Sequence, residues 1–342
     1  MTHPRKKRPV LRQPETVAPA PARRRTRKAD PDRARRHVYG PVPSRRLGYS
    51  LGVDILRPKT CTIDCVYCQL GPTPHTTVRR RDFVDVDAVI GQIRAAVESG
   101  RRIDHITFSG SGEPTLNKSI GRIIRAIKDM TEILVVVLTN GTLLHRRDVR
   151  RDLQAADIVV PSLDAATPAM FARVNRPQAS LSFDKMIAGL KTFRREFSGQ
   201  IWLEVMLLKG LNDGPAHIRK LKTLIEEIGP DKVHLNTAVR PPAEKSVRAL
   251  DREALAKIRD FLGGTAEVVA DFYGSRRAAA DEDASAAVLD MVRRRPVTVA
   301  DIAATLGRHP DEIRKTLDVL IDGGRVRPVR RSHRIYYTST TP

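Results

Sequence analysis

Short apolar runs alternate with amphipathic stretches along most of the chain, beginning near residue 50. Runs rich in β-branched residues predict strands, and apolar residues spaced three and four apart predict helices. The predicted strands are Ser50–Leu56, Ile103–Phe108, Ile133–Leu138, Asp157–Val160, Ile201–Leu208 and Val233–Thr237, with Val268–Phe272 as a candidate for one more. The predicted helices are Asp87–Glu98, Ser119–Asp129, Arg147–Ala155, Phe183–Phe197, Pro215–Ile228 and Asp251–Leu262. Strand followed by helix, repeated six times, predicts an α/β domain of parallel strands joined by right-handed crossovers.

The pattern changes on both sides of this repeat, which predicts four parts in the chain. Residues 1–36 have no hydrophobic period and are rich in Pro, Ala and Arg, so we expect a disordered basic arm. The repeat forms a core domain over residues 37–275, and the polar residues 276–283 form a linker. Residues 284–338 predict the helices Ala284–Arg294, Thr298–Leu306 and Asp311–Asp322, then a hairpin of Val326–Val329 and Arg334–Thr338. That order is typical of a small winged helix-turn-helix domain.

Charge and hydropathy limit where the protein works. The net charge is +22, from 61 Lys and Arg against 39 Asp and Glu, and the predicted arm alone has 13 basic residues against 3 acidic ones. Such an arm can contact nucleic acid, or it can simply keep the protein in solution. The longest apolar run, Ile133–Leu138, is far shorter than the roughly 18–20 residues of a membrane span, and the N-terminus has no apolar signal segment. We therefore expect a cytoplasmic protein that does not contact a membrane.

The chain has three cysteines, Cys61, Cys65 and Cys68, and all lie within eight residues after the first predicted strand. A secreted scaffold would spread an even number of cysteines along the chain, so this grouping indicates a metal site. Thiolates so closely spaced can bind separate irons of one iron–sulfur cluster and leave one iron open, as a catalytic site needs. The alternatives are a zinc site completed by His75, a redox dithiol, or buried free thiols. Zinc is disfavoured because C-x3-C-x2-C lacks the two separated ligand pairs of a zinc finger.

The cysteine motif, with Tyr67 before its last Cys, resembles the signature of the radical S-adenosylmethionine (radical SAM) superfamily. Further segments resemble the wyosine-synthetase-like Fe–S oxidoreductase group of that superfamily, namely Val42–Gly48, Cys65–Gly71, Ser109–Thr115, Arg173–Pro177, Leu203–Leu207 and Leu235–Thr237. The resemblance covers residues 39 to about 275. It implies that the core domain is an open six-stranded (β/α)6 partial TIM barrel, in agreement with the six strand–helix units.

The resemblance also implies a chemistry. The three cysteines would bind one [4Fe–4S] cluster, whose open iron would chelate the amino and carboxylate groups of S-adenosylmethionine (SAM). One electron would cleave SAM to methionine and a 5′-deoxyadenosyl radical, which would abstract hydrogen from a substrate. An external low-potential donor of the flavodoxin or ferredoxin type would supply the electron. In such systems the cofactor performs the difficult chemistry, and the protein orients it and excludes water.

Polar clusters follow the predicted strands, and in parallel βα folds the chemistry lies on those loops. The resemblance implies that the SAM contacts come from Tyr67, Ser109, Ser111, Gly112, Glu113, Asn140, Ser162 and Asp164. The structural alternatives are ordinary turn chemistry for Asn140 before Gly141, and a helix cap for Ser162 and Asp164. No catalytic residue is assigned beyond the cluster ligands.

Trp202, Glu204 and Met206 alternate along the fifth predicted strand, so all three are expected to point to one face. If that face is the barrel interior, Glu204 is a buried carboxylate and needs a partner. A salt bridge to an arginine such as Arg173 or Arg176 is one explanation, and substrate or cofactor binding is the other.

The substrate is less well defined than the reaction class. Wyosine synthetases act on a guanosine of transfer RNA and use a second cluster, for which this chain has no cysteine. The predicted wing, Arg325–Arg334, holds five Arg and no acidic residue, which suits nucleic-acid phosphates, whereas the third predicted helix carries several acidic residues. Three functions are therefore considered: a radical enzyme modifying RNA, a radical enzyme acting on a small molecule or protein with the wing for docking, and an Fe–S-sensing DNA-binding regulator. A polar rim with a SAM-binding motif disfavours the regulator.

Overall fold

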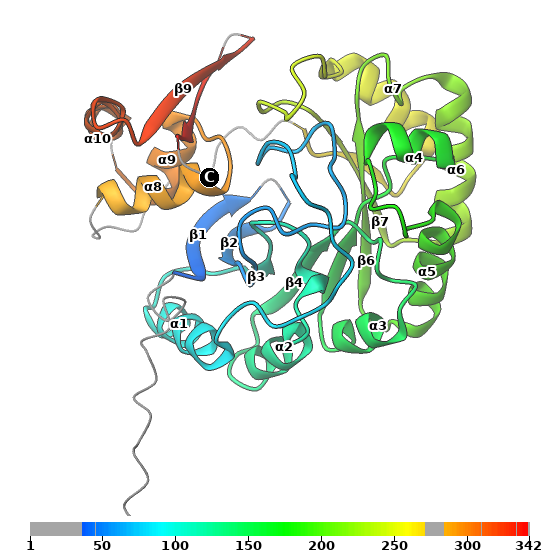
Figure 1. Ribbon diagram of the computed structural model, residues 1–342, viewed down its shortest axis with the longest axis horizontal. Helices are drawn as coiled ribbons and strands as arrows, with labels where there is room; N and C mark the ends of the chain where they lie inside the picture. The colour runs from blue at the N-terminus through cyan, green and yellow to red at the C-terminus, as the bar shows by residue number, and fades with distance from the viewer. Residues whose placement is uncertain (1–35, 45, 271–283, 309, 333, 341–342) are drawn as a thin grey trace, which may run out of the picture.

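The computed structural model describes residues 36–44, 46–270, 284–308, 310–332 and 334–340 (Figure 1). Within them, one eight-stranded sheet runs in chain order from β1 to β8. Its strands are β1 (Val38–Ser44), β2 (Gly48–Val53), β3 (His105–Phe108), β4 (Leu134–Thr139), β5 (Ile158–Pro161), β6 (Gln200–Leu207), β7 (Lys232–Thr237) and β8 (Ala266–Val268). Strands β2 to β8 are parallel, and β1 is antiparallel to β2.

Helices connect the parallel strands and lie along the outer side of the curved sheet (Figure 1). They are α1 (Val86–Glu98), the short 3-10 helix η2 (Pro114–Leu116), α2 (Ile120–Lys128), α3 (Arg147–Leu153), α4 (Pro168–Val174), α5 (Phe183–Glu196), α6 (Pro215–Ile228) and α7 (Arg252–Leu262). Each of the six predicted strand–helix units is present. The predicted α/β fold with a parallel sheet is therefore confirmed.

Three elements of the core domain differ from the prediction. Strand β1 was not predicted, because Gly40 and two prolines interrupt its apolar pattern. Helix α4 was also missed: it has only seven residues, and it begins at Pro168 after the capping side chain of Thr167. The extra strand expected at Val268–Phe272 lies earlier, as β8, and residues 271–272 fall outside the described part of the chain.

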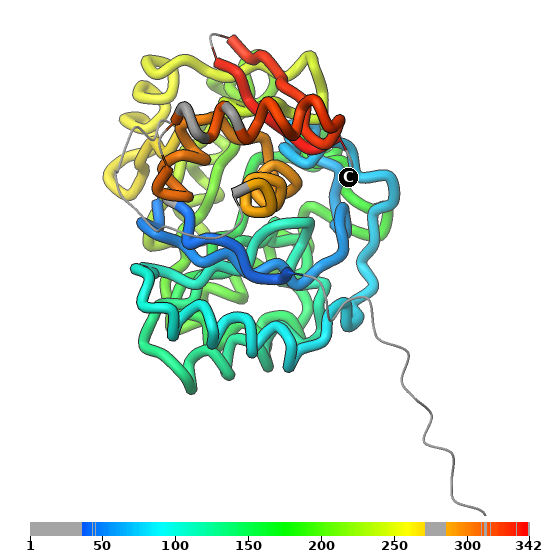
Figure 2. The backbone as a smooth tube through the Cα atoms, turned by 90° about the vertical axis from the view of Figure 1, so that its left-hand side faces the viewer, coloured from blue at the N-terminus to red at the C-terminus, as the bar shows by residue number. Residues whose placement is uncertain are grey.

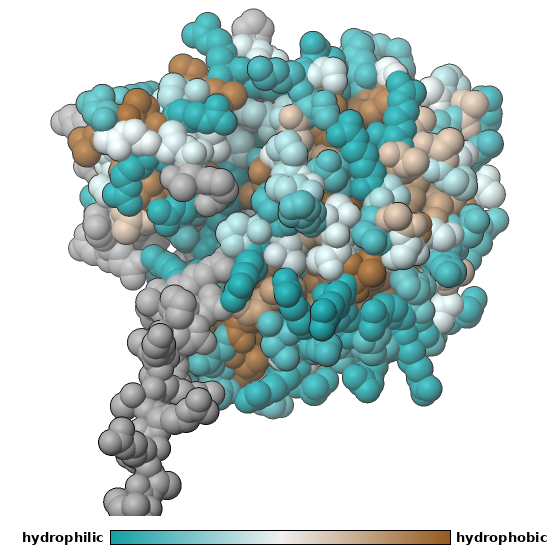
Figure 3. All heavy atoms as spheres, viewed as in Figure 1, coloured by the Kyte–Doolittle hydropathy of each residue, from teal (hydrophilic) through white to brown (hydrophobic). Residues whose placement is uncertain are grey.

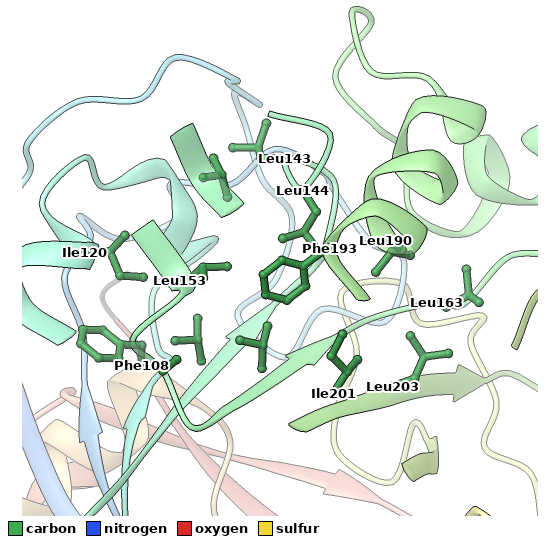
Figure 4. Packing of buried hydrophobic residues seen from close by; sticks show 14 of the residues in the cluster. Phe108, Ile120, Leu143, Leu144, Leu153, Leu163, Leu190, Phe193, Ile201 and Leu203 are labelled. Carbon is green, nitrogen blue, oxygen red and sulfur yellow. The ribbon is translucent and has the colours of Figure 1, made fainter. Parts of the chain in front are cut away.

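The alternation of side chains along β4 shows how the sheet separates two layers of apolar residues. Val135 and Val137 belong to the large core between the sheet and the helices. Val136 and Leu138 instead join a smaller cluster inside the barrel with Trp202 of β6. Figure 4 shows part of the large core, with Phe108, Ile120, Leu143, Leu144, Leu153, Leu163, Leu190, Phe193, Ile201 and Leu203 labelled. Both faces of the central strands are thus buried, as is usual for parallel sheets.

The C-terminal segment forms a second apolar core. It contains α8 (Ala284–Arg294), α9 (Val299–Leu306), α10 (Pro310–Asp322) and the antiparallel hairpin of β9 (Val326–Arg331) and β10 (Arg334–Ser339). Figure 2 shows this segment next to β1. The hairpin contacts the core domain, because Arg331 Nη2 donates to Val247 O at 2.8 Å and Tyr336 OH donates to Val239 O at 2.9 Å. The predicted arm, apart from Arg36, and the predicted linker lie outside the described residues.

Charged and polar side chains cover most of the face in Figure 3, with separate apolar patches between them. Among the described residues, every helix is too short or too polar to cross a membrane.

We predict that Phe193→Ala strongly destabilises the core domain. Phe193 is fully buried and stacks on Phe197 with ring centroids 4.7 Å apart, so truncation leaves a cavity worth about 3–5 kcal/mol of unfolding free energy. Phe261→Ala is the matched control, because that ring is 45% exposed, and its cost should stay below about 1 kcal/mol. Urea unfolding followed by circular dichroism measures both, and equal costs would contradict the assigned packing.

Candidate active site

The cysteine loop, residues 54–85, follows β2, and backbone hydrogen bonds to neighbouring segments hold it in place. Thr60 and Gly112 form an isolated parallel bridge, in which Glu113 N donates to Thr60 O at 2.9 Å. A Cβ at Gly112 would lie 1.8 Å from Thr60 O, so this approach requires glycine. Farther along, Val66 N donates to Val174 O at 3.0 Å. The loop is therefore fixed against the loops that follow β3 and β5.

The three cysteine sulfurs lie on this loop, and a nitrogen donor approaches each of them. Cys65 is buried, Cys61 and Cys68 are half-buried, and none forms a disulfide. Hydrogen bonds to sulfur stabilise a thiolate and tune the potential of a cluster that it binds. The pairs are Asn140 Nδ2 with Cys61 Sγ at 3.6 Å, Asn175 Nδ2 with Cys65 Sγ at 3.5 Å, and Lys59 Nζ with Cys68 Sγ at 3.5 Å.

Two of these thiols are held in their neutral form by their surroundings. Burial, together with the negative charge of Glu113, raises the pKa of the Cys61 thiol to about 12, and burial also raises the pKa of Cys65. Both are therefore neutral without metal, and metal binding must displace their protons. Within the described residues, no group of three His, Cys, Asp or Glu side chains is arranged to hold one metal ion.

Glu113 connects the loop after β3 with the turn after β4. Its carboxylate is buried, and it accepts hydrogen bonds from Thr115 N, Thr115 Oγ1, Thr139 Oγ1 and Asn140 N at 2.6–3.0 Å. Burial raises the pKa of Glu113 in spite of these donors. The side chain of Asn140 continues towards the cysteines, since its Nδ2 donates to Thr62 Oγ1 at 2.7 Å as well as to Cys61. Three predicted residues, Cys61, Glu113 and Asn140, are thus brought together.

Asp164 organises the opposite side of the site. Its Oδ2 accepts from Tyr67 OH and from Asn175 Nδ2, the latter at 2.7 Å, and its Oδ1 accepts from Met206 N at 2.9 Å. Burial raises the pKa of Asp164 to about 6 against the effect of these donors. The predicted residues Tyr67 and Asp164 are therefore direct partners. Asp164 does not cap the following helix, because α4 is capped by Thr167.

The predicted serines have less direct connections to the cysteines. Ser109 Oγ is hydrogen bonded to Tyr39 OH at 2.7 Å, and Ser111 Oγ donates to Asp54 Oδ2 at 2.5 Å. Both hydroxyls are therefore occupied by residues of the β1–β2 region. Ser162 is half-buried, and its backbone forms a parallel bridge with Glu204. The bridge links the loop after β5 to the middle of β6.

Glu204 has a partner, but the expected arginines do not provide it. Arg46 Nη1 lies 2.7 Å from Glu204 Oε2, and Asn236 Nδ2 donates to Oε1 at 2.9 Å. Burial acts to raise the pKa of Glu204, but the Arg46 charge and these hydrogen bonds lower it overall. Arg176 instead pairs with Glu244 at 2.7 Å. The prediction that Trp202, Glu204 and Met206 share a face agrees with the inner clusters that contain Trp202 and Met206.

Sequence reasoning missed the residues that donate to Cys65 and Cys68. Asn175 lies inside the segment Arg173–Pro177, which resembles the family but predicts no role for Asn175 itself. Lys59 lies two residues before Cys61 and has φ +58°, the left-handed conformation, from which its Nζ also reaches Gly71 O. A lysine flanking a cysteine motif is a weak signal, because lysines in loops are usually solvated.

Comparison with known proteins identifies the class of this barrel with its three thiols. The Radical SAM superfamily model matches residues 55–225, half of the chain. SuiB of Streptococcus suis, a solved structure, covers 65% of this chain and 49% of its own at a TM-score of 0.50 and 15% identity, which reflects a shared fold. The chain therefore belongs to the radical SAM superfamily. It is a radical SAM enzyme, and membership implies an iron–sulfur cluster and SAM as cofactors.

Relatives narrow the family further. A UPF0026 protein of Methanocaldococcus jannaschii is 35% identical over 223 residues, which are 65% of this chain and 69% of the relative. The chain is accordingly a member of the UPF0026 proteins. GTPase Obg of Brachyspira hyodysenteriae is 37% identical over 299 residues, which are 85% of this chain but only 43% of that protein. The present sequence contains no Gly-Lys pair and hence no P-loop, so this match does not transfer a GTPase site.

We predict that Glu113→Gln destabilises the protein by about 1–3 kcal/mol. All four hydrogen bonds reach Glu113 as an acceptor, so the glutamine NH2 would face a donor whichever way the amide is turned. Glu98→Gln, at an exposed position, is the control and should change the free energy of unfolding by less than about 0.5 kcal/mol. Denaturant unfolding of the metal-free protein tests this, and equal effects of the two variants would refute the assigned role.

Proposed function

We propose that Cys61, Cys65 and Cys68 bind one [4Fe–4S] cluster and that SAM binds beside it. The observation that carries this proposal is the set of three thiols, each with its own nitrogen donor, next to the paired loops of Glu113 and Asn140. Three protein thiolates leave one iron free for a ligand that is not protein. When bound, the cluster supplies one electron that cleaves SAM to methionine and a 5′-deoxyadenosyl radical, which abstracts hydrogen from the substrate.

The protein's own groups prepare this site in three ways. The bridge between Thr60 and Gly112 fixes the ligand loop, and Glu113 holds the loop after β3 at a set distance from Asn140. The Tyr67 hydroxyl donates a hydrogen bond to the buried carboxylate of Asp164, which fixes the position of the phenol ring. Because these groups satisfy one another, little rearrangement is needed when the cofactors bind. The residues proposed to contact SAM are Tyr67, Ser109–Glu113, Asn140, Ser162 and Asp164.

The electron comes from an external low-potential protein, of the flavodoxin or ferredoxin type. The given sequence has no further cysteine that could bind a second cluster, which is why the proposed donor is a separate protein. Thiolate-bound clusters and low-potential donors persist in reducing compartments, which is why the cytoplasm is the proposed location.

We infer that residues 284–338 act as a winged helix-turn-helix domain and that the substrate is a nucleoside in transfer RNA. Arg327 and Arg330 on β9 are exposed, and the hairpin sits on the core domain through Arg331 and Tyr336. A basic hairpin in that position suits the phosphates of an RNA that reaches the barrel. The second candidate is a small-molecule or protein substrate with this domain used for docking, which the acidic residues exposed on α10, Asp318 and Asp322, favour.

We predict that protein reconstituted anaerobically with iron and sulfide forms 5′-deoxyadenosine when dithionite and SAM are added. Cys65→Ala should abolish this product because it removes one of three ligands. The measurement is chromatography of 5′-deoxyadenosine, with iron content determined in parallel. An intact, reducible cluster that forms no 5′-deoxyadenosine, even with transfer RNA or cell extract present, would refute the proposed reaction and favour a cluster-sensing regulator.

We also predict that unfractionated transfer RNA binds with a strong dependence on salt and stimulates cleavage of SAM. Replacing Arg327 and Arg330 by Ala should reduce the slope of log K against log salt by about 1–2, as expected when two phosphate contacts are lost. The control removes two charges from exposed positions of α6, Arg219 and Lys220. Tighter binding of duplex DNA than of transfer RNA would favour the regulator, and cleavage that RNA does not affect would favour the small-molecule or protein substrate.

A further inference from the structure

Arg294 is the last residue of α8, yet its side chain is only 10% exposed, because it lies against the core domain. Its Nη1 is 3.1 Å from Asp54 Oδ2, at the end of β2. Its Nη2 donates to Asp290 Oδ1 at 3.0 Å and to Arg36 O at 3.2 Å. The guanidinium also covers the ring of Tyr39, 4.0 Å from the ring centroid. One cation of the C-terminal segment thus contacts both of the first two strands of the sheet.

The two core residues beneath this guanidinium each hold one end of the loop after β3. Asp54 Oδ2 also accepts from Ser111 Oγ at 2.5 Å. Tyr39 OH is hydrogen bonded to Ser109 Oγ at 2.7 Å. Between the two serines, Gly110 has φ +135°, and a Cβ there would lie 2.7 Å from Asp54 Cγ. Asp54 therefore contacts this loop at both Gly110 and Ser111.

The next two residues of this loop are the ones already tied to the cysteine loop, since Gly112 and Glu113 bridge to Thr60. A continuous series of contacts therefore runs from α8 through Asp54 and Tyr39 to the backbone beside Cys61. Asp54 is 2% exposed, and removing a cation that contacts a buried carboxylate destabilises that carboxylate. Removing the guanidinium would favour any movement that hydrates Asp54, and such a movement shifts Ser111.

We propose that Arg294 is a positioning residue for SAM: it holds the Ser109–Glu113 loop in its binding conformation and makes the C-terminal segment a functional part of the core site. This inference rests on the proposed function, because it requires that the loop bind SAM. Coupling by this route is reciprocal, so a ligand that shifts α8 changes SAM affinity, and SAM binding stabilises the contact of α8 with β1 and β2.

The test uses the full chain, reconstituted with its cluster, as wild type and as Arg294→Ala, Arg294→Lys and Tyr39→Phe. Arg293→Ala is the matched control, because it removes the same charge from the preceding, exposed position of α8. Two readouts are needed: the dependence of 5′-deoxyadenosine formation on SAM concentration, and deuterium uptake by the peptide spanning residues 105–117 in the metal-free protein. The second readout does not depend on the cofactors, so it separates failure of this inference from failure of the proposed function.

We expect Arg294→Ala to raise KM for SAM about tenfold while kcat at saturating SAM changes less than about twofold, the pattern of lost uniform binding. Arg294→Lys should recover part of the affinity, since it restores the charge beside Asp54 but not the fork of hydrogen bonds. Tyr39→Phe removes only the bond to Ser109 and should raise KM about threefold, which keeps the test valid if Arg294→Ala folds poorly. Faster deuterium uptake by residues 105–117 should accompany both.

The inference is overturned if Arg294→Ala and Tyr39→Phe match Arg293→Ala in both KM and deuterium uptake. It is also overturned if kcat falls while KM and uptake stay unchanged, because the arginine would then act on a later step. If the wild type itself fails to cleave SAM, the uptake measurement alone decides whether Arg294 holds the loop.

Discussion

The site depends on one backbone contact, the bridge between Thr60 and Gly112. The cysteine loop contributes few apolar side chains to the large core, so hydrogen bonds to neighbouring loops must hold it in place. Because no side chain fits between Gly112 and Thr60 O, the two loops meet at backbone distance. Asn140 contacts both loops: its Nδ2 donates to Cys61 Sγ, and its backbone N donates to the carboxylate of Glu113. The bridge therefore fixes the cysteine loop beside the loop that carries Glu113.

Three carboxylates, buried Glu113 and Asp164 and half-buried Glu204, are stabilised in two different ways. Glu113 accepts from four uncharged donors and Asp164 from three, and burial raises the pKa of both carboxyls. Glu204 has a full cation, Arg46, and its pKa is lowered. In mildly acidic solution the carboxyl of Asp164 is therefore largely protonated, which lowers the negative charge near the thiols. Glu204 remains ionised under the same conditions. The difference matters because thiolates and a carboxylate repel one another in a medium of low dielectric constant.

The sequence was sufficient for elements with a regular pattern and for chemistry confined to one loop. Runs such as Ile133–Leu138 are short and rich in β-branched residues, which favours strands of a buried sheet. The cysteine spacing can be recognised in the sequence itself. Strand β1 could not be predicted, because Gly40 and two prolines break its apolar pattern. It forms because it pairs with β2. The partner of Glu204 was also out of reach. Arg46 is distant from Glu204 in the chain, and the curved sheet brings its guanidinium to this carboxylate.

The prolines of β1 limit the pairing of this edge strand with strands of other molecules. An open barrel ends in strand edges that could pair with a strand of another molecule, the route by which sheets aggregate. Pro41 and Pro43 lie in β1 and have no N–H to offer, and prolines are tolerated in sheets mainly at such edges. Helix α9 packs next to the same strand (Figures 1 and 2). An intruding strand would therefore find an incomplete row of donors and would also have to displace a helix.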